Sequence, residues 1–158
     1  MKENNHLPVF GIGPYMIGLI AAISILAIFL SLDKVIPNYP SNVIIMDVIG
    51  LILIVFGAIF WVFTVLKSRI DNCIRNNHLV TTGIYGIVRH PIYAAFLYAI
   101  TGLIFIANNL ILIILPVIYW LILSLAMIKT EEKWLIDLYG DDYLNYSKKV
   151  NRFIPKVT

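Results

Sequence analysis

Four apolar segments alternate with polar ones along this chain. They cover approximately residues 15–32, 43–66, 91–107 and 110–128. At about 1.5 Å per residue, helices of these lengths roughly match the 30 Å hydrocarbon core of a bilayer. The pattern predicts an all-α, polytopic membrane protein, in which residues 1–158 form a single membrane domain with about four transmembrane helices.

Asparagine, proline and glycine residues predict a turn, a kink and a close helix contact among these segments. Asn108 and Asn109 predict a tight turn between the third and fourth segments. Pro116 lies inside the fourth segment and predicts a kink there. Gly50 and Gly57 share one helical face and would let another helix approach closely, either within the chain or in a homo-oligomer.

Composition agrees with a membrane location. Sixty per cent of the residues are hydrophobic and 13% are charged, whereas soluble domains contain roughly 25% charged residues. The mean hydropathy is +0.88. The three histidines, His6, His78 and His90, and the single cysteine, Cys73, show no HxxxH or CxxC spacing, so no metal site is predicted.

Basic residues are distributed unevenly between the two sides of the predicted membrane domain. Eleven of the twelve Lys and Arg residues lie in the N-terminal segment, in the loop 67–89 or after residue 128, and only Lys34 lies on the opposite side. The positive-inside rule therefore places both termini in the cytoplasm. Binding of anionic membrane lipid is another interpretation of this charge, whereas no nucleic-acid-binding motif occurs and no nucleic-acid partner is expected.

Two polar clusters flank the third and fourth segments, one within residues 78–93 and one within 129–155. One helix out and one helix back, each rising about 25–29 Å, separate Tyr93 from Glu131. Both clusters therefore return to the same cytoplasmic face. Arg89 can bind a carboxylate through two hydrogen bonds, and His90 can donate or accept a hydrogen bond. The glutamates can accept hydrogen bonds from hydroxyl or ammonium groups. The same residues could instead form a charge cluster that holds helix ends in register.

The tail after residue 129 has a helical pattern of its own. Five residues fall on one helical face: Glu132, Ile136, Tyr139, Tyr143 and Tyr146. The pattern predicts a C-terminal amphipathic cytoplasmic helix. Gly140 followed by Asp141 indicates a stop and a new start inside it.

Five short blocks of the chain form a pattern. They are Leu79-Val80-Thr81-Thr82-Gly83-Ile84-Tyr85, Arg89-His90-Pro91-Ile92-Tyr93, Glu131-Glu132 with Leu135, Tyr139-Gly140 with Tyr143 and Tyr146, and Arg152-Phe153-Ile154-Pro155. In this order they resemble the isoprenylcysteine carboxyl methyltransferase family and its phospholipid methyltransferase relatives. The resemblance implies an integral membrane enzyme that transfers a methyl group from S-adenosyl-L-methionine. One departure is Ala95, where the family often has glycine; its methyl group would narrow the space near the cofactor.

The resemblance also implies roles for individual residues. Those that match the cofactor-binding region are Tyr85, Val88, His90, Pro91, Tyr93, Glu131 and Glu132. Arg152 matches an arginine on the acceptor side, and either Arg152 or Arg89 would hold an acceptor carboxylate. A carboxylate needs no general base, whereas an amine acceptor would need one, with His90 or a glutamate as the candidate.

The predicted reaction is methyl transfer to a lipophilic small molecule, with isoprenylcysteine-type carboxylates as the first choice. Three alternatives remain at this point: N-methylation of a phospholipid amine, a member without catalysis that binds a lipid or a partner, and a nicotinamide-dependent membrane reductase. Cofactor preference would separate the reductase from the methyltransferase.

Overall fold

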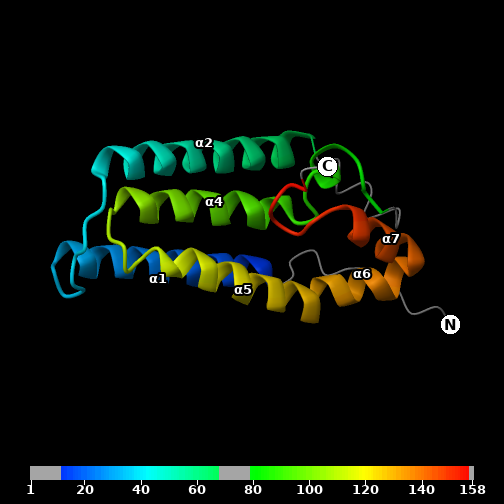
Figure 1. The fold of residues 1–158 in the computed structure, drawn as a ribbon. Helices are drawn as coiled ribbons and strands as arrows, with labels where there is room; N and C mark the ends of the chain where they lie inside the picture. Colours follow the sequence, from blue (N-terminus) through cyan, green and yellow to red (C-terminus); the bar gives the residue numbers. More distant parts are fainter. Residues whose placement is uncertain (1–11, 68–78, 157–158) are drawn as a thin grey trace.

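The computed structural model describes residues 12–67 and 79–156 of the 158. Four long helices run along the molecule, and short helices gather at one end of them (Figure 1). The long helices are α1 (Gly13–Leu32), α2 (Val43–Lys67), α4 (Pro91–Ile106) and α5 (Ile114–Lys129), and the short ones are η1 (Gly83–Gly86), α6 (Glu131–Tyr139) and α7 (Asp141–Lys149). The described residues contain no strand, and the predicted all-α class is confirmed.

Helix α4 is the centre of the bundle. It lies between α2 on one side and α1 with α5 on the other (Figure 1). Half of its residues are buried, whereas the outward faces of α1 and α2 carry many exposed large apolar side chains. This distribution fits a bundle whose surroundings are lipid, because exposed apolar surface on this scale is unfavourable in water.

Three helical stretches are long and apolar enough to cross a membrane, namely Gly13–Leu32, Val43–Leu66 and Ile114–Tyr139. The last one joins α5 to α6, and its apolar part ends with α5 at Lys129. We take α5 as the part that crosses. Helix α4 has 16 residues and is shorter than these stretches. It is partly covered by its neighbours, and polar residues of this chain lie at both of its ends, Arg89 and His90 before it and Asn108 and Asn109 after it.

The fourth span begins later than predicted. Residues 107–113 form turns and α5 starts at Ile114, not at residue 110. Pro116 is therefore in the first turn of α5, where backbone amides have no partner inside the helix, so the N–H that proline lacks costs no hydrogen bond. A proline kinks a helix when it lies in the interior, so this position gives no reason for the predicted kink.

The tight turn predicted at Asn108 and Asn109 is confirmed, and it is anchored to the loop between α1 and α2. Asn108 adopts a φ of 48°, and its side chain accepts a hydrogen bond from the amide of Ser41 at 3.1 Å. The Asn109 side chain is buried and donates to Ser31 Oγ at 2.8 Å and to the Pro37 carbonyl at 3.2 Å. These bonds join both helical hairpins at the end opposite α6 and α7.

The glycine face of α2 packs within the chain, against α4. A Cβ on Gly50 would lie 2.7 Å from the carbonyl oxygen of Gly102, and one on Gly57 would lie 2.6 Å from that of Ala95. Ala95 and Ala99 therefore belong to the face of α4 that contacts α2. Tyr93, two residues before Ala95, points to roughly the opposite side of the helix. The backbone of Ala95 is thus part of the α2 contact, away from the Tyr93 side.

The C-terminal amphipathic segment consists of two helices instead of one. Gly140 has a φ of 54°, a conformation that favours glycine, and it ends α6. Helix α7 starts at Asp141, as the Gly140-Asp141 pair indicated. Tyr143 and Tyr146 are buried on the inner face of α7. The chain thereby turns back toward the start of α4.

Candidate functional site

Residues 150–155, which we call the C-terminal strap, lie across the start of α4. The amide of Arg89 donates to the carbonyl of Asn151 at 2.8 Å, and the amide of His90 donates to that of Arg152 at 3.0 Å. Phe153 is 1% exposed, and its ring centre lies 6.0 Å from that of His90. These contacts bring the last motif block onto the second one.

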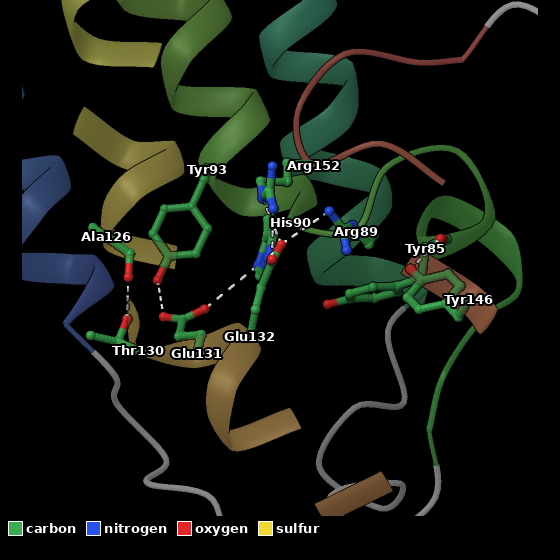
Figure 2. A network of polar contacts seen from close by, with 10 residues as sticks. All are labelled: Tyr85, Arg89, His90, Tyr93, Ala126, Thr130, Glu131, Glu132, Tyr146 and Arg152. Carbon is green, nitrogen blue, oxygen red and sulfur yellow. Dashed lines mark hydrogen bonds and ion pairs between the residues drawn. The ribbon is translucent and has the colours of Figure 1, made fainter. Parts of the chain in front are cut away.

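Glu132, the second residue of α6, is the centre of a buried ionic cluster (Figure 2). Arg152 donates to both carboxylate oxygens, from Nε at 2.8 Å and from Nη2 at 2.9 Å. Arg89 Nη2 lies 3.1 Å from Oε1, and His90 Nε2 lies 3.4 Å from the same oxygen. Three elements far apart in sequence therefore meet at one carboxylate.

These partners keep Glu132 ionised. Burial by itself raises the pKa of this carboxyl group, because it penalises the charged form. Hydrogen bonds from His90 and Arg152, together with the charges of Arg89 and Arg152, outweigh burial and lower the pKa from 4.5 to about 2. The cluster is thus held by a carboxylate that is charged throughout the physiological pH range.

Glu131 faces a different set of groups. Its carboxylate accepts a hydrogen bond from the Tyr93 hydroxyl, and His90 Nδ1 lies 3.6 Å from Oε2. Figure 2 shows His90 between the two glutamates, with one ring nitrogen directed toward each. Carboxylates only accept hydrogen bonds, and even a neutral imidazole carries one N–H, so the ring can donate to at least one of these two carboxylates.

Tyrosines from η1 and α7 border the cluster beside Arg89. The Tyr146 hydroxyl donates to the Tyr85 carbonyl at 2.6 Å, and the Arg89 guanidinium carbon lies 5.9 Å from the centre of the Tyr143 ring. Burial, followed by the charge of Glu131, raises the pKa of Tyr85 to about 12. Burial, followed by the charge of Glu132, raises that of Tyr143 to about 12. Both hydroxyls therefore remain protonated at neutral pH.

Two buried donors of this region have no hydrogen-bond partner among the described residues: Arg89 Nε and the Tyr143 hydroxyl. Burying a polar group without a partner costs about 1–3 kcal/mol. Such groups are often found where a ligand completes the hydrogen bonding. The side of the site with Arg89 and Tyr143 therefore has hydrogen-bond donors that a ligand could use.

The structure brings most of the residues expected in the site into direct polar contact, namely Arg89, His90, Tyr93, Glu131, Glu132 and Arg152. Tyr85 contributes its carbonyl. Val88 is fully buried in the apolar core, and Pro91 is buried at the first position of α4. His6, Cys73 and His78 lie outside the described residues.

Sequence reasoning missed the contacts of three residues. Phe153 is part of the last block of the resemblance, but the sequence gives no indication that it packs on His90 and Tyr93. Tyr98 donates to the Phe153 carbonyl at 3.1 Å, which holds the strap to α4. Tyr143 was identified by its helical spacing on the face of Glu132 and by the family resemblance, but its contact with Arg89 was not predicted.

A family model described as phospholipid methyltransferase matches residues 45–142, which is more than half of the chain. The match runs from α2 to the start of α7, and it includes Arg89, His90, Tyr93 and both glutamates.

Curated relatives point in the same direction. A protein-S-isoprenylcysteine O-methyltransferase from Xenopus laevis is 33% identical over 70% of this chain, and one from Schizosaccharomyces pombe is 36% identical over 52% of it. Methanethiol S-methyltransferase 1 from Bradyrhizobium diazoefficiens is 36% identical over 50%. The chain spans 41%, 35% and 30% of the lengths of these three relatives, respectively.

Proposed function

Since this chain belongs to the phospholipid methyltransferase family, we propose that it is an integral membrane methyltransferase that uses S-adenosyl-L-methionine. The acceptor in this proposal is a lipophilic molecule with a free carboxylate, of the isoprenylcysteine type. The observation that carries the proposal is the buried ionic cluster around Glu132, which lies where the apolar bundle ends. A cluster in this position can serve a polar cofactor and a lipid-soluble acceptor together.

The residues present fit this cofactor. S-adenosyl-L-methionine carries an ammonium group, a carboxylate and a sulfonium, and it supplies an activated methyl group when bound. Glu131 offers an acceptor for the ammonium group, and its side chain is 20% exposed, more than the 8% of Glu132. The partnerless donors, Arg89 Nε and the Tyr143 hydroxyl, suit the carboxylate.

The chain itself contributes positioning and exclusion of water. Methyl transfer needs an in-line approach of the acceptor atom to the methyl carbon, so orientation supplies much of the rate. The strap covers His90 and Tyr93 with the buried ring of Phe153. Arg152 would bind the acceptor carboxylate, and Glu132 holds the guanidinium groups of both Arg152 and Arg89 in place.

The surroundings of His90 favour a carboxylate acceptor over an amine. An amine or a thiol must lose a proton, which requires a base with a free lone pair. His90 is 6% exposed, and both of its nitrogens face carboxylate oxygens, at 3.6 Å and 3.4 Å, so neither nitrogen is open to an acceptor. A carboxylate acceptor needs no base. The names of the Xenopus and Schizosaccharomyces relatives support the same choice.

We also propose that this site faces the cytoplasm, with both termini on the same side. The start of α1, the end of α2, the start of α4 and the end of α5 lie at one end of the bundle (Figure 1). In the sequence, eleven of the twelve basic residues precede α1, lie between residues 67 and 89, or follow residue 128, in agreement with the positive-inside rule.

Calorimetric titration of the detergent-purified protein with S-adenosylhomocysteine, and separately with NADPH, tests the cofactor. Saturable binding of S-adenosylhomocysteine alone is the expected result. Binding of NADPH alone would favour a membrane reductase. Failure of both ligands in a folded sample would favour a member that binds lipid or a partner without catalysis.

Transfer of a labelled methyl group tests the acceptor. An S-farnesylated, N-acetylated cysteine is the probe, and its methyl ester is the matched control because the carboxylate is already blocked. Phosphatidylethanolamine represents the amine alternative. Labelling of the free acid alone is expected, and labelling of phosphatidylethanolamine instead would overturn the acceptor assignment.

A further inference from the structure

Gly13, the first residue of α1, lies against the Tyr93 side chain. A Cβ added to Gly13 would overlap the hydroxyl group and Cζ of Tyr93, whereas one added to Gly18 on the same helix would meet nothing within 4 Å. Gly13 is buried. The absence of a side chain at this one position therefore leaves room for the tip of the Tyr93 ring.

The Tyr93 hydroxyl that occupies this space is the group that donates to Glu131. A larger residue at position 13 would have to displace the ring, because the hydroxyl end is the movable part of this contact. Tyr93 lies in the first turn of α4, and Glu131 is the first residue of α6. The hydrogen bond between them thus depends on where α1 begins.

We propose that Gly13 is a positioning residue for the site: it fixes the Tyr93 ring so that the hydroxyl orients the Glu131 carboxylate toward the cofactor. The part concerning the cofactor rests on the proposed function. Gly13 lies outside residues 45–142, which match the family model. The contact between α1 and Tyr93 is therefore not covered by that match.

Gly13→Ala is the test variant, and Gly18→Ala is its control on the same helix. Protein labelled with carbon-13 at tyrosine Cζ reports the hydrogen bonding of each hydroxyl, and Tyr93→Phe identifies the Tyr93 signal among those of the nine tyrosines. The Tyr93 signal should shift in Gly13→Ala and stay in place in Gly18→Ala. An unshifted signal in Gly13→Ala overturns the proposal, whether or not a cofactor binds.

Affinity for S-adenosylhomocysteine supplies the second readout. Gly13→Ala should weaken binding roughly 10- to 100-fold, as expected when a hydrogen bond to a charged group is lost, and its melting temperature should fall below that of Gly18→Ala because the same bond is lost from the folded protein. In the Tyr93→Leu background, where the shorter side chain leaves the space empty, Gly13→Ala should have no further effect. Equal losses in both backgrounds would show that Gly13 does not act through Tyr93.

The two proposals fail differently. If wild-type protein does not bind S-adenosylhomocysteine, the proposed function fails, and the tyrosine signal alone decides the role of Gly13. If wild-type protein binds and Gly13→Ala shifts the signal without changing affinity, the positioning role is wrong.

Discussion

Arg152 and Glu132 form a two-point ion pair in which Nε and Nη2 of the arginine each donate to a different carboxylate oxygen, at 2.8 Å and 2.9 Å. The pair connects the C-terminal strap to α6. The arginine is partly exposed and the glutamate is buried. An arginine expected on the acceptor side therefore also holds the carboxylate at the centre of the cluster.

Removing this arginine should affect both stability and binding. Arg152→Ala should lower the free energy of unfolding by about 1–2 kcal/mol, less than a fully buried pair because solvent screens the arginine, and should weaken S-adenosylhomocysteine binding. Arg152→Lys keeps the charge but cannot span both oxygens, so an intermediate effect is expected. Lys149→Ala, an exposed change at the end of α7, is the control. Lost turnover with unchanged affinity and melting temperature would restrict Arg152 to the acceptor.

Replacing Glu132 should produce a defect that depends on pH. Glu132→Gln leaves Arg89 buried without its counter-charge, which should cost about 3 kcal/mol at neutral pH. The pKa of Glu132 is lowered from 4.5 to about 2, so the carboxylate stabilises the fold fully above the unfolded value. That contribution is lost as the pH falls through the folded value.

Thermal unfolding of wild type and Glu132→Gln between neutral pH and about pH 2 measures this effect. The difference in melting temperature should hold down to about pH 4.5 and then shrink. Asp137→Asn, at an exposed position of the same helix, should show no such convergence. A difference that stays constant to the lowest pH would contradict the ionic role of Glu132.

Tyr143 and Tyr146 provide a matched pair of hydroxyl deletions. The Tyr143 hydroxyl has no partner among the described residues, so Tyr143→Phe should leave stability unchanged or slightly raised and weaken S-adenosylhomocysteine binding. Tyr146→Phe removes the bond to the Tyr85 carbonyl and should cost about 1 kcal/mol of stability. Unfolding curves and calorimetry separate the two. Tyr143→Phe with full affinity would exclude its hydroxyl from the cofactor site.

Much of this arrangement follows from local sequence patterns. Apolar length predicts the spans, and paired asparagines predict the turn at 108–109 because they tolerate a left-handed backbone. The return of Tyr93 and Glu131 to one membrane face follows from helical rise alone. Gly140 marks the break between α6 and α7 through its positive φ.

The pairings inside the site depend on geometry that no local pattern encodes. Glu131 and Glu132 are adjacent, and only the direction in which α6 starts decides which one meets Arg152 and which one meets Tyr93. That direction, and the angle set at Gly140, also decide where the strap returns. The contact of Gly13 with Tyr93 joins residues 80 positions apart across two helices, which apolar periodicity cannot reveal.

Gly57 should not tolerate even a methyl group. Its Cβ would lie 2.6 Å from the Ala95 carbonyl oxygen and 3.0 Å from the Ala99 amide nitrogen. Both are backbone atoms, so α2 and α4 must separate, and Gly57→Ala should cost about 1–3 kcal/mol. Gly18→Ala should be neutral or slightly stabilising, because alanine favours helix and no atom lies within 4 Å. Equal melting temperatures for the two variants would contradict close packing of α2 on α4.

Asn109 should stabilise the fold without affecting the site at the other end of the bundle. Asn109→Ala removes the donors to Ser31 and Pro37 and the acceptor for the amide of Ile111, which should cost about 2–3 kcal/mol because the partners stay buried. Affinity of the folded fraction for S-adenosylhomocysteine should not change. Asn145→Ala, on the exposed side of α7, is the control. If Asn109→Ala instead weakens binding at unchanged stability, the turn at 108–109 must be coupled to the site through α4 or α5.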